Sequence, residues 1–329
     1  LGALDALFWT LFAGLGPMFL FLVLRFLREA GRSERSVRDD LLITVLFAVG
    51  SVYYFVAVQG TVWFAAHVAA ASFVCLYLLF AFGARRPSLA GLCLGLAFLC
   101  RPATLLLAPF FLIEAWSSRR AATEGDTQSK QPLFGTLSMF ALPLLLILSV
   151  AMWHNSVRFD DPFEFGHSFL QVRWRARIET WGLFSTHYLP RNLTVFFLSL
   201  PWLLESSPFV RVSRHGLALW FTSPFLLWGV WPRRLDATVV ALWAAVLPTA
   251  LCTLLYQNTG WMQFGPRFSL DYLPLLFVLL ALSGRRFGSA FLACAIFAIA
   301  VNGFGAATFD RFLEFYDDDP TQQVIFQPD

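Results

Sequence analysis

The chain has 329 residues, of which 58% are hydrophobic and only 14% charged, and its formal net charge is +3. Soluble domains carry about a quarter charged residues, so this composition excludes an ordinary soluble protein. The small excess of positive charge gives no reason to expect a nucleic-acid partner.

Ten apolar segments follow one another along the chain. They cover about residues 4–27, 41–58, 61–83, 88–100, 103–116, 133–153, 216–232, 237–256, 268–283 and 287–305. These segments do not alternate between apolar and polar residues, as barrel strands would, and a bilayer leaves backbone groups no partner outside the protein. We therefore predict an all-α integral membrane protein, a polytopic bundle of about ten membrane helices that forms a single transmembrane domain over residues 1–329.

Basic residues predict the orientation of this bundle. They cluster in five connections, at residues 25–38, 85–86, 119–130, 233–234 and 285–286. Short loops rich in Lys and Arg remain on the cytoplasmic side of a membrane. We therefore place these connections inside and the remaining ones outside.

The stretch 88–116 has two interpretations, because it is long enough for one helix or for two short arms. A single helix would place Arg85 and Arg119 on opposite sides, whereas a hairpin keeps both inside. Pro102 disfavours helix at the residue before it and is welcome in a first helical turn. The sequence thus predicts a hairpin with its turn at Arg101, ten crossings, and both termini outside. Because the chain begins with Leu1 and no basic leader, we expect a preceding N-terminal piece to be missing.

Polar residues gather on the predicted outer side. The long segment 154–215 mixes tryptophans and phenylalanines with arginines, which is typical of amphipathic helices lying on a membrane surface. Residues 306–329 form a second outer segment, predicted as a solvated tail. All five histidines fall near or beyond the outer face, whereas the five cysteines lie inside apolar runs with no spacing for a metal or disulfide framework. No group of ligand residues predicts a metal site.

Two arginines are candidates for anion binding on this outer side. Arg101 lies between two apolar arms, where a charge is costly and usually functional, although an ion pair across the bundle would explain it equally well. Arg267 and Asp271 are four residues apart at the head of a predicted helix, so an intrahelical salt bridge is the simpler explanation for this pair. The run 257–266 before them is rich in amides, aromatics and glycine, which suits recognition of a sugar or a phosphate.

The motifs resemble those of a known family. The run GLCLGLAFLCRP over residues 91–102 is similar to the GLxxGLAxLxRP hairpin of bacterial membrane glycosyltransferases of the GT-C superfamily. These enzymes are relatives of the protein mannosyltransferases and of the lipid A aminoarabinose transferases. Further blocks at residues 159–166, 188–192, 222–224 and 258–271 resemble, in order, those of one bacterial branch, so the resemblance covers about residues 41–285.

The resemblance implies an enzyme of the bacterial inner membrane that works at the outer face. Its donor would be a sugar on a polyprenyl phosphate and its acceptor a glycan, lipid or protein, while the need for a divalent metal stays open. An acidic residue in the first external loop would act on the acceptor; it is expected upstream of Leu1, with Asp5 as a weaker candidate. The residues assigned to substrate binding are Trp63, His67, Arg101, Arg191, Asn258, Trp261, Gln263, Arg267 and Asp271.

Two alternatives remain open. A transporter or flippase of lipid-linked sugars would use the same polar residues, but it predicts charges near the midplane and an internal repeat, and no repeat is visible. A non-catalytic membrane scaffold would tolerate the loss of Arg101 and Arg267. For single arginines of the segment 154–215, binding to lipid headgroups is the simpler interpretation.

Overall fold

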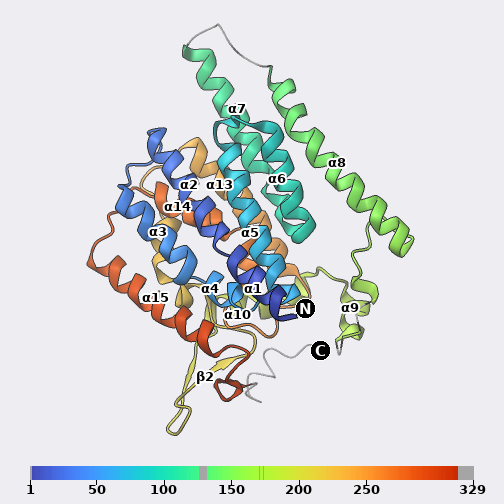
Figure 1. The fold of residues 1–329 in the computed structure, drawn as a ribbon, viewed down its shortest axis with the longest axis vertical. Helices are drawn as coiled ribbons and strands as arrows, with labels where there is room; N and C mark the ends of the chain where they lie inside the picture. Colours follow the sequence, from blue (N-terminus) through green and yellow to red (C-terminus); the bar gives the residue numbers. More distant parts are fainter. Residues whose placement is uncertain (1, 126–131, 170, 173, 318–329) are drawn as a thin grey trace.

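The computed structural model describes residues 2–125, 132–169, 171–172 and 174–317, so that Lys130, Arg173 and the tail from 318 onward lie outside the described residues. The protein is mostly helical (Figure 1). Its α-helices are α1 (Gly2–Phe12), α2 (Leu15–Glu29), α3 (Val37–Val49), α4 (Tyr53–Ala57), α5 (Val62–Ala81), α6 (Pro87–Cys100), α7 (Ala108–Gly125), α8 (Leu133–Phe159), α9 (Arg175–Trp181), α10 (Leu189–Leu198), α11 (Leu219–Thr222), α12 (Leu227–Val230), α13 (Ala237–Leu255), α14 (Leu273–Leu282) and α15 (Ser289–Thr308).

Short 3-10 turns and three short strands complete the described fold. The turns are η1 (Phe82–Ala84), η2 (Pro102–Leu107), η3 (His167–Phe169), η4 (Thr186–Tyr188), η5 (Pro224–Leu226), η6 (Arg267–Asp271) and η7 (Leu313–Phe315). The strands are β1 (Trp202–Leu203), β2 (Val210–Ser213) and β3 (Tyr316–Asp317), and they form a sheet in the order β1-β2-β3, antiparallel and then parallel.

Five helical stretches are long and apolar enough to cross a membrane. They are Leu4–Glu29, Val62–Ala84, Leu133–Phe159, Ala237–Leu255 and Ser289–Thr308. A bilayer requires roughly 20 residues per helix, so these stretches fit a multi-pass membrane protein. Each of the ten predicted apolar segments contains helix, but the number of ten crossings stays a prediction.

Two predicted helices are interrupted where the sequence carries a breaker. The segment 216–232 consists of α11, η5 and α12, with Ser223 between the first two in a non-helical conformation (φ −143°). The following Pro224 disfavours a helical residue before it and cannot donate a backbone hydrogen bond. The segment 41–58 is likewise divided into α3 and α4 at Gly50. Local chemistry therefore sets these breaks inside apolar runs.

The core centres on α14, which is apolar on all sides and in which every residue from Leu273 to Ala281 is buried. A helix of this kind belongs in the interior of a bundle. By contrast, α8 lies at the periphery and only about a tenth of its most apolar stretch is buried inside the protein. Figure 1 shows α8 close to α6 in its first half and diverging from the bundle in its second half.

Arginine-rich connections meet at one end of the bundle, which we call the arginine-rich end. Buried Glu114 on α7 accepts hydrogen bonds from Arg32 Nη1, from the Gly83 backbone N–H and from Thr238 Oγ1, each at 2.8 Å. Arg35 donates to the Leu280 and Ala281 carbonyls at the end of α14. The connections before α3, α6, α13 and α15 thus share one end, as the pattern of basic residues predicts.

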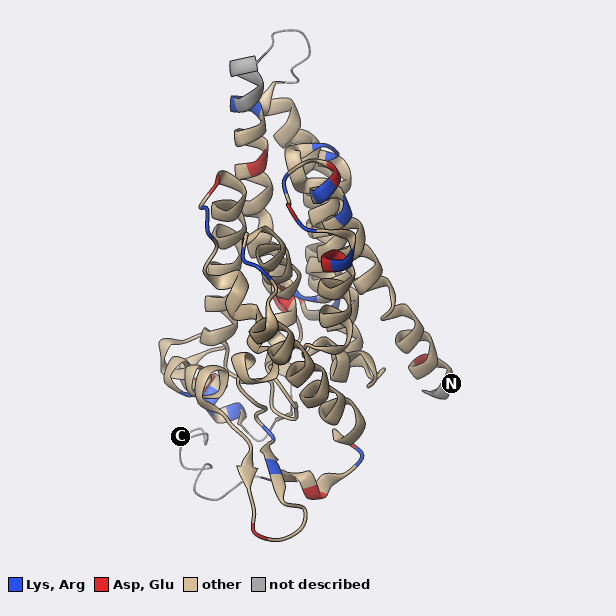
Figure 2. Ribbon diagram, turned by 90° about the vertical axis from the view of Figure 1, so that its left-hand side faces the viewer, with Lys and Arg blue, Asp and Glu red and all other residues tan. Residues whose placement is uncertain are grey.

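Charged residues gather toward the ends of the molecule, while most of the ribbon between them carries none (Figure 2). The end opposite the arginine-rich end holds the connection between α4 and α5 and the short sheet. The segment 154–215, predicted as amphipathic helices, does contain α9 and α10. It also contains β1 and β2, which the sequence analysis did not anticipate.

Candidate functional site

Arg101 and Asp271 form a bidentate ion pair across the bundle. Helix α6 ends at Cys100, and Arg101 adopts an extended conformation (φ −147°, ψ 99°) before Pro102. Its Nε and Nη2 donate to the two carboxylate oxygens of Asp271, each at 3.0 Å. The Asp271 side chain is fully buried and that of Arg101 is 23% exposed. The interpretation of Arg101 as one half of an ion pair across the bundle is therefore confirmed.

The predicted salt bridge between Arg267 and Asp271 is wrong. Residues 267–271 form a 3-10 turn instead of an α-helix, so positions i and i+4 do not lie above one another on one face. Asp271 instead binds Arg101, which lies 170 residues away along the chain. Both oxygens of the buried Asp271 carboxylate thus accept from one guanidinium group, whose charge balances that of the carboxylate.

Arg267 has no carboxylate partner among the described residues. Its Nη1 donates to the Met262 carbonyl at 3.0 Å, and its buried Nε has no hydrogen-bond partner in the described part of the chain. Burial, and then the like charge of Arg101, lower the pKa of this guanidinium to about 10. Even so, Arg267 remains cationic at neutral pH. It is a half-buried cation without a counter-anion in the part of the chain that the structure describes.

The ring of Phe268 lies close to both of these guanidinium groups. The Arg101 carbon Cζ is 4.9 Å from its ring centre and that of Arg267 is 5.5 Å away, while Arg267 also lies 5.0 Å from the ring of Phe64. Aromatic faces attract cations at such distances. The rings therefore stabilise both arginines without neutralising them, and the two arginines with Asp271 leave one positive charge in the cluster.

His67 completes this cluster from α5. Its side chain is buried, its Nδ1 lies 3.6 Å from Asp271 Oδ1, and its ring centre is 5.7 Å from that of Phe268. At 3.6 Å the contact exceeds normal hydrogen-bond length. His67 thus lies next to the ion pair without a close partner for Nδ1. We call the set His67, Arg101, Arg267, Phe268 and Asp271 the arginine site.

The loop before Arg267 is built around Gln263. This buried amide donates to the carbonyls of His215 at 2.7 Å and Thr259 at 2.8 Å, and its oxygen accepts from the Arg267 backbone N–H at 3.0 Å. Met262 has a positive φ of 58°, which non-glycine residues rarely adopt. Predicted as a pocket residue, Gln263 fixes the loop and so positions Arg267.

Asn258 and Trp261 belong to the same loop. Asn258 Oδ1 accepts from the backbone N–H groups of Gly260 and Trp261, each at 2.9 Å, and so closes a local turn. The Trp261 ring packs edge-on against His215 at 4.9 Å, and His215 Nδ1 lies 2.7 Å from Thr259 Oγ1. His215 and Thr259 were not among the predicted site residues, because they are 44 positions apart and their contact cannot be inferred from spacing.

The remaining predicted site residues lie elsewhere. Arg191, on α10, donates to the Gln257 carbonyl at 2.8 Å and lies 5.6 Å from the Tyr188 ring. Trp63 is 65% exposed, although it was assigned to a pocket. Asp5 is exposed on α1. The structure thus brings His67, Arg101, Arg267 and Asp271 together, and it adds Phe64 and Phe268, which ordinary apolar patterning did not distinguish from core residues.

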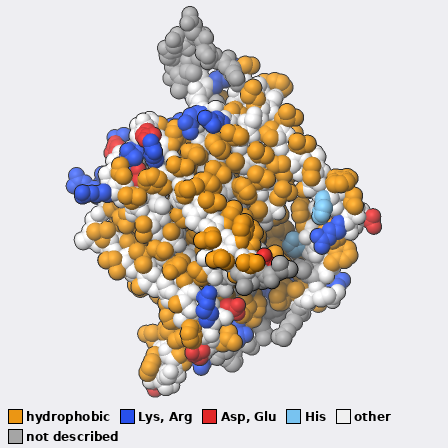
Figure 3. Space-filling view, in the orientation of Figure 1, with side chains coloured by type: hydrophobic (Ala, Val, Ile, Leu, Met, Phe, Trp, Pro, Cys, Tyr) orange, Lys and Arg blue, Asp and Glu red, His pale blue; other side chains and the backbone are white. Residues whose placement is uncertain are grey.

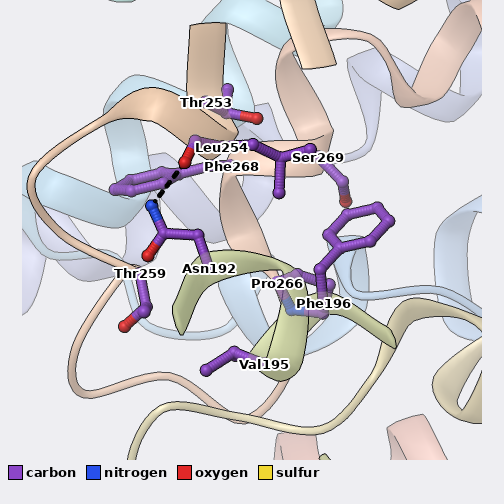
Figure 4. Close-up of a pocket in the computed structure, with 9 residues that line it drawn as sticks. All are labelled: Asn192, Val195, Phe196, Thr253, Leu254, Thr259, Pro266, Phe268 and Ser269. Carbon is purple, nitrogen blue, oxygen red and sulfur yellow. Dashed lines mark hydrogen bonds between the residues drawn. The ribbon is translucent and has the colours of Figure 1, made fainter. Parts of the chain in front are cut away.

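A small pocket lies beside Phe268 (Figure 4). It is lined by Asn192, Val195, Phe196, Thr253, Leu254, Thr259, Pro266, Phe268 and Ser269. The buried Asn192 amide donates to the carbonyls of Leu254 at 2.8 Å and Tyr256 at 2.7 Å, which ties α10 to the end of α13. In the space-filling view the largely hydrophobic surface is hollowed at one place, where histidine is visible (Figure 3).

Within the described residues, no three His, Cys, Asp or Glu side chains come together as a metal site would require. Comparisons of the chain with models of protein families, with curated proteins and with solved structures found no match. The function must therefore be argued from the chemistry of the arginine site.

Proposed function

We propose that the protein is a membrane glycosyltransferase that takes a sugar from a polyprenyl-phosphate donor and passes it to an acceptor. The observation that carries the proposal is Arg267, a half-buried cation without a carboxylate partner among the described residues, beside a second guanidinium. An isolated buried charge is costly. An anionic ligand that occupies the arginine site would offset this cost.

A phosphate group suits these donors. Arg101 is oriented by its two bonds to Asp271, so that Nη1 is the nitrogen without a protein acceptor in the described chain. Arg267 offers Nε. Guanidinium groups bind phosphate with good geometry, and when the sugar leaves, the same groups would stabilise the charge that develops on the phosphate.

The surroundings favour a lipid-borne phosphate over a soluble one. The arginine site lies where α5, α6 and α14, all strongly apolar helices, meet the loop 257–266. Phe64 and Phe268 line it. Asp271 would position Arg101 and not act as the base, because both of its carboxylate oxygens already accept hydrogen bonds from Arg101. The acid that activates the acceptor would be another residue.

Binding of the donor tests the proposal. Purified protein in nanodiscs would be titrated with a set of polyprenyl-phosphate sugars and with polyprenyl phosphate alone, using the wild type, Arg267→Ala and the control Arg158→Ala. Arg158 is exposed near the end of α8, and its guanidinium lies over the ring of Phe159. A charged hydrogen bond contributes about 1.5–3 kcal/mol, so Arg267→Ala should bind at least tenfold more weakly. Unchanged binding would exclude the phosphate assignment.

Product analysis separates transfer from the two alternatives. A glycosyltransferase forms a new glycosidic bond and releases polyprenyl phosphate, whereas a flippase moves the intact lipid-linked sugar across liposomes without releasing it. A scaffold does neither and would keep the activity of its partner after Arg267→Ala. Release of polyprenyl phosphate that depends on Arg267 is the outcome that the proposal requires.

A further inference from the structure

Two connections at the arginine-rich end, one before α13 and one before α15, lie side by side. The Arg233 backbone N–H donates to the Ser283 carbonyl at 2.9 Å, and Arg285 Nε donates to the Trp231 carbonyl. Gly284 adopts a positive φ of 66°, and a Cβ placed there would lie 3.6 Å from that of Arg233. The fold therefore joins two arginine pairs, Arg233-Arg234 and Arg285-Arg286, which we call the arginine cluster.

Among the described residues, no carboxylate neutralises the charges of this cluster. Arg233, Arg234 and Arg286 are exposed, and none of the four arginines forms an ion pair with a carboxylate in the described chain. The nearest acid along the sequence is Asp236, whose carboxylate accepts from the Val239 backbone N–H at 2.8 Å and caps α13. Within the described chain the cluster therefore has no counter-anion and offers its guanidinium groups to an anionic ligand.

Large apolar side chains surround the cluster. Trp231 is 73% exposed and Leu235 74%, and on α12 Leu227 is 55% and Val230 43% exposed. Tryptophan is enriched at the level of lipid headgroups, with apolar residues toward the acyl chains and basic residues toward the phosphates. A soluble anion would use the arginines but would leave these apolar side chains in water.

We propose that the arginine cluster, with Trp231, Leu227 and Leu235, binds an anionic phospholipid. The guanidinium groups contact the phosphate and the negative headgroup, and the apolar side chains contact the first part of the acyl chains. Arg35 contacts both sides of the connection that carries Arg285 and Arg286. It donates to carbonyls near the end of α14, and its Cζ lies 3.8 Å from the centre of the Phe287 ring. This inference is independent of the transfer reaction.

Native mass spectrometry with added lipid tests the proposal. The wild type, R233Q/R234Q/R286Q and the charge-preserving variant R233K/R234K/R286K would be titrated with phosphatidylglycerol and with phosphatidylcholine. R158Q/R175Q, which removes two exposed arginines of the segment 154–215, is the control for ordinary headgroup contacts outside the cluster. None of the three cluster side chains donates a hydrogen bond in the described structure, so the glutamine variant should fold. Unfolding temperatures in phosphatidylcholine nanodiscs would check this.

Each arginine near an anionic surface contributes roughly a fivefold gain in affinity, so the glutamine variant should lose about a hundredfold in affinity for phosphatidylglycerol. The lysine variant and the control should retain most of it, and phosphatidylcholine should bind weakly to all. Equal affinity of the wild type and the glutamine variant for phosphatidylglycerol would overturn the proposal. So would stabilisation of the wild type by inorganic phosphate to the same extent as by the lipid, since the site would then be one for a soluble anion.

Discussion

Arg101 and Arg267 belong to the same site, but they differ in whether a carboxylate balances their charge. The charge of Arg101 is balanced by the buried Asp271, whereas that of Arg267 faces only aromatic rings and a carbonyl. Burial lowers the pKa of both, but for Arg101 the Asp271 charge and hydrogen bonds reverse the effect and the pKa is raised. The charge of Arg101 therefore stabilises the folded protein, whereas the charge of Arg267 lowers the free energy of unfolding.

Methionine substitutions should separate the two roles. Arg101→Met leaves the Asp271 carboxylate buried and unpaired, which costs about 3–5 kcal/mol of unfolding free energy. Arg267→Met removes a group whose pKa is lower in the folded protein than in the unfolded chain, so that its charge opposes folding at pH 7. The expected result is a lower unfolding temperature for Arg101→Met and an unchanged or higher one for Arg267→Met, measured in one detergent. The reverse order would refute this division of roles.

His215 predicts a dependence of stability on pH. Burial, and then the charges of Arg191 and Arg177, lower its pKa to about 3, so the folded protein keeps this imidazole neutral where the unfolded chain protonates it near pH 6.5. His215 therefore does not reduce the free energy of unfolding above pH 6.5. As the pH falls from 6.5 toward 3, protonation of this imidazole in the unfolded chain lowers the free energy of unfolding by up to about 1.4 kcal/mol per pH unit.

A variant isolates this contribution. In His215→Asn the amide can replace the contact with Thr259 but does not titrate, so unfolding temperatures measured at pH 7, 5.5 and 4.5 should decline less steeply than in the wild type. His154→Asn, an exposed change on α8, serves as the control. Parallel declines in the wild type and His215→Asn would assign the acid sensitivity to other groups.

Sequence reasoning could identify the charged members of the arginine site but not their partners. Arg101 and Arg267 stand out because charges are rare in apolar runs. Their geometry depends on contacts across the bundle, and the spacing of Arg267 and Asp271 predicted the wrong pair because the local helix is 3-10. Phe268 was not recognised, since an aromatic residue in an apolar protein carries no signal until its neighbours are known.

At the scale of elements, α6 and α8 pack through glycine. A Cβ at Gly91 would lie 1.9 Å from the Phe140 carbonyl oxygen, and one at Gly95 would lie 2.6 Å from Ile147 Cδ1. Small residues spaced four apart allow membrane helices to approach closely. Two glycines of the run over residues 91–102 therefore have a structural role in packing α6 against α8.

Gly91→Ala should separate these two helices. The methyl group would meet backbone rather than a flexible side-chain end, so α8 must shift, and we expect a loss of about 1–3 kcal/mol, as for overpacking in other cores. Gly303→Ala on α15 is the matched control: a Cβ there meets nothing within 4 Å, and alanine should be neutral or stabilising in a helix. Unfolding temperatures of both variants measure the difference, and equal values would show that α8 adapts freely.

Pro102 predicted the end of α6 correctly, at Cys100. The breaks at Gly50 and before Pro224 were not predicted, because hydropathy alone joins the apolar runs that these residues divide. The strands could not be foreseen, because β1 and β3 contain two residues each and depend on pairing with β2. Such short strands have no periodicity of their own, so only tertiary contacts define them.

At the scale of the whole molecule, basic connections distant in the sequence meet at one end, while α15 runs toward the other end and leads to β3. This helix has 20 residues, or roughly 30 Å, which matches the hydrocarbon thickness of a bilayer. Its first residue, Ser289, follows the arginine cluster. The hairpin of β1 and β2 lies at the opposite end, paired with β3.

Cysteine labelling should reveal this polarity. Ser206→Cys in the hairpin and Ser289→Cys at the start of α15 are matched changes at exposed serines, and the native cysteines are buried or half-buried, so the wild type gives the background. If the arginine-rich end is cytoplasmic, as short basic connections predict, a membrane-impermeant maleimide should label Ser206→Cys in intact cells and Ser289→Cys only after permeabilisation. Labelling of Ser289→Cys alone in intact cells would invert the orientation. Labelling of both would contradict a chain that exposes its two ends on opposite sides of a membrane, because α15 would then not separate them.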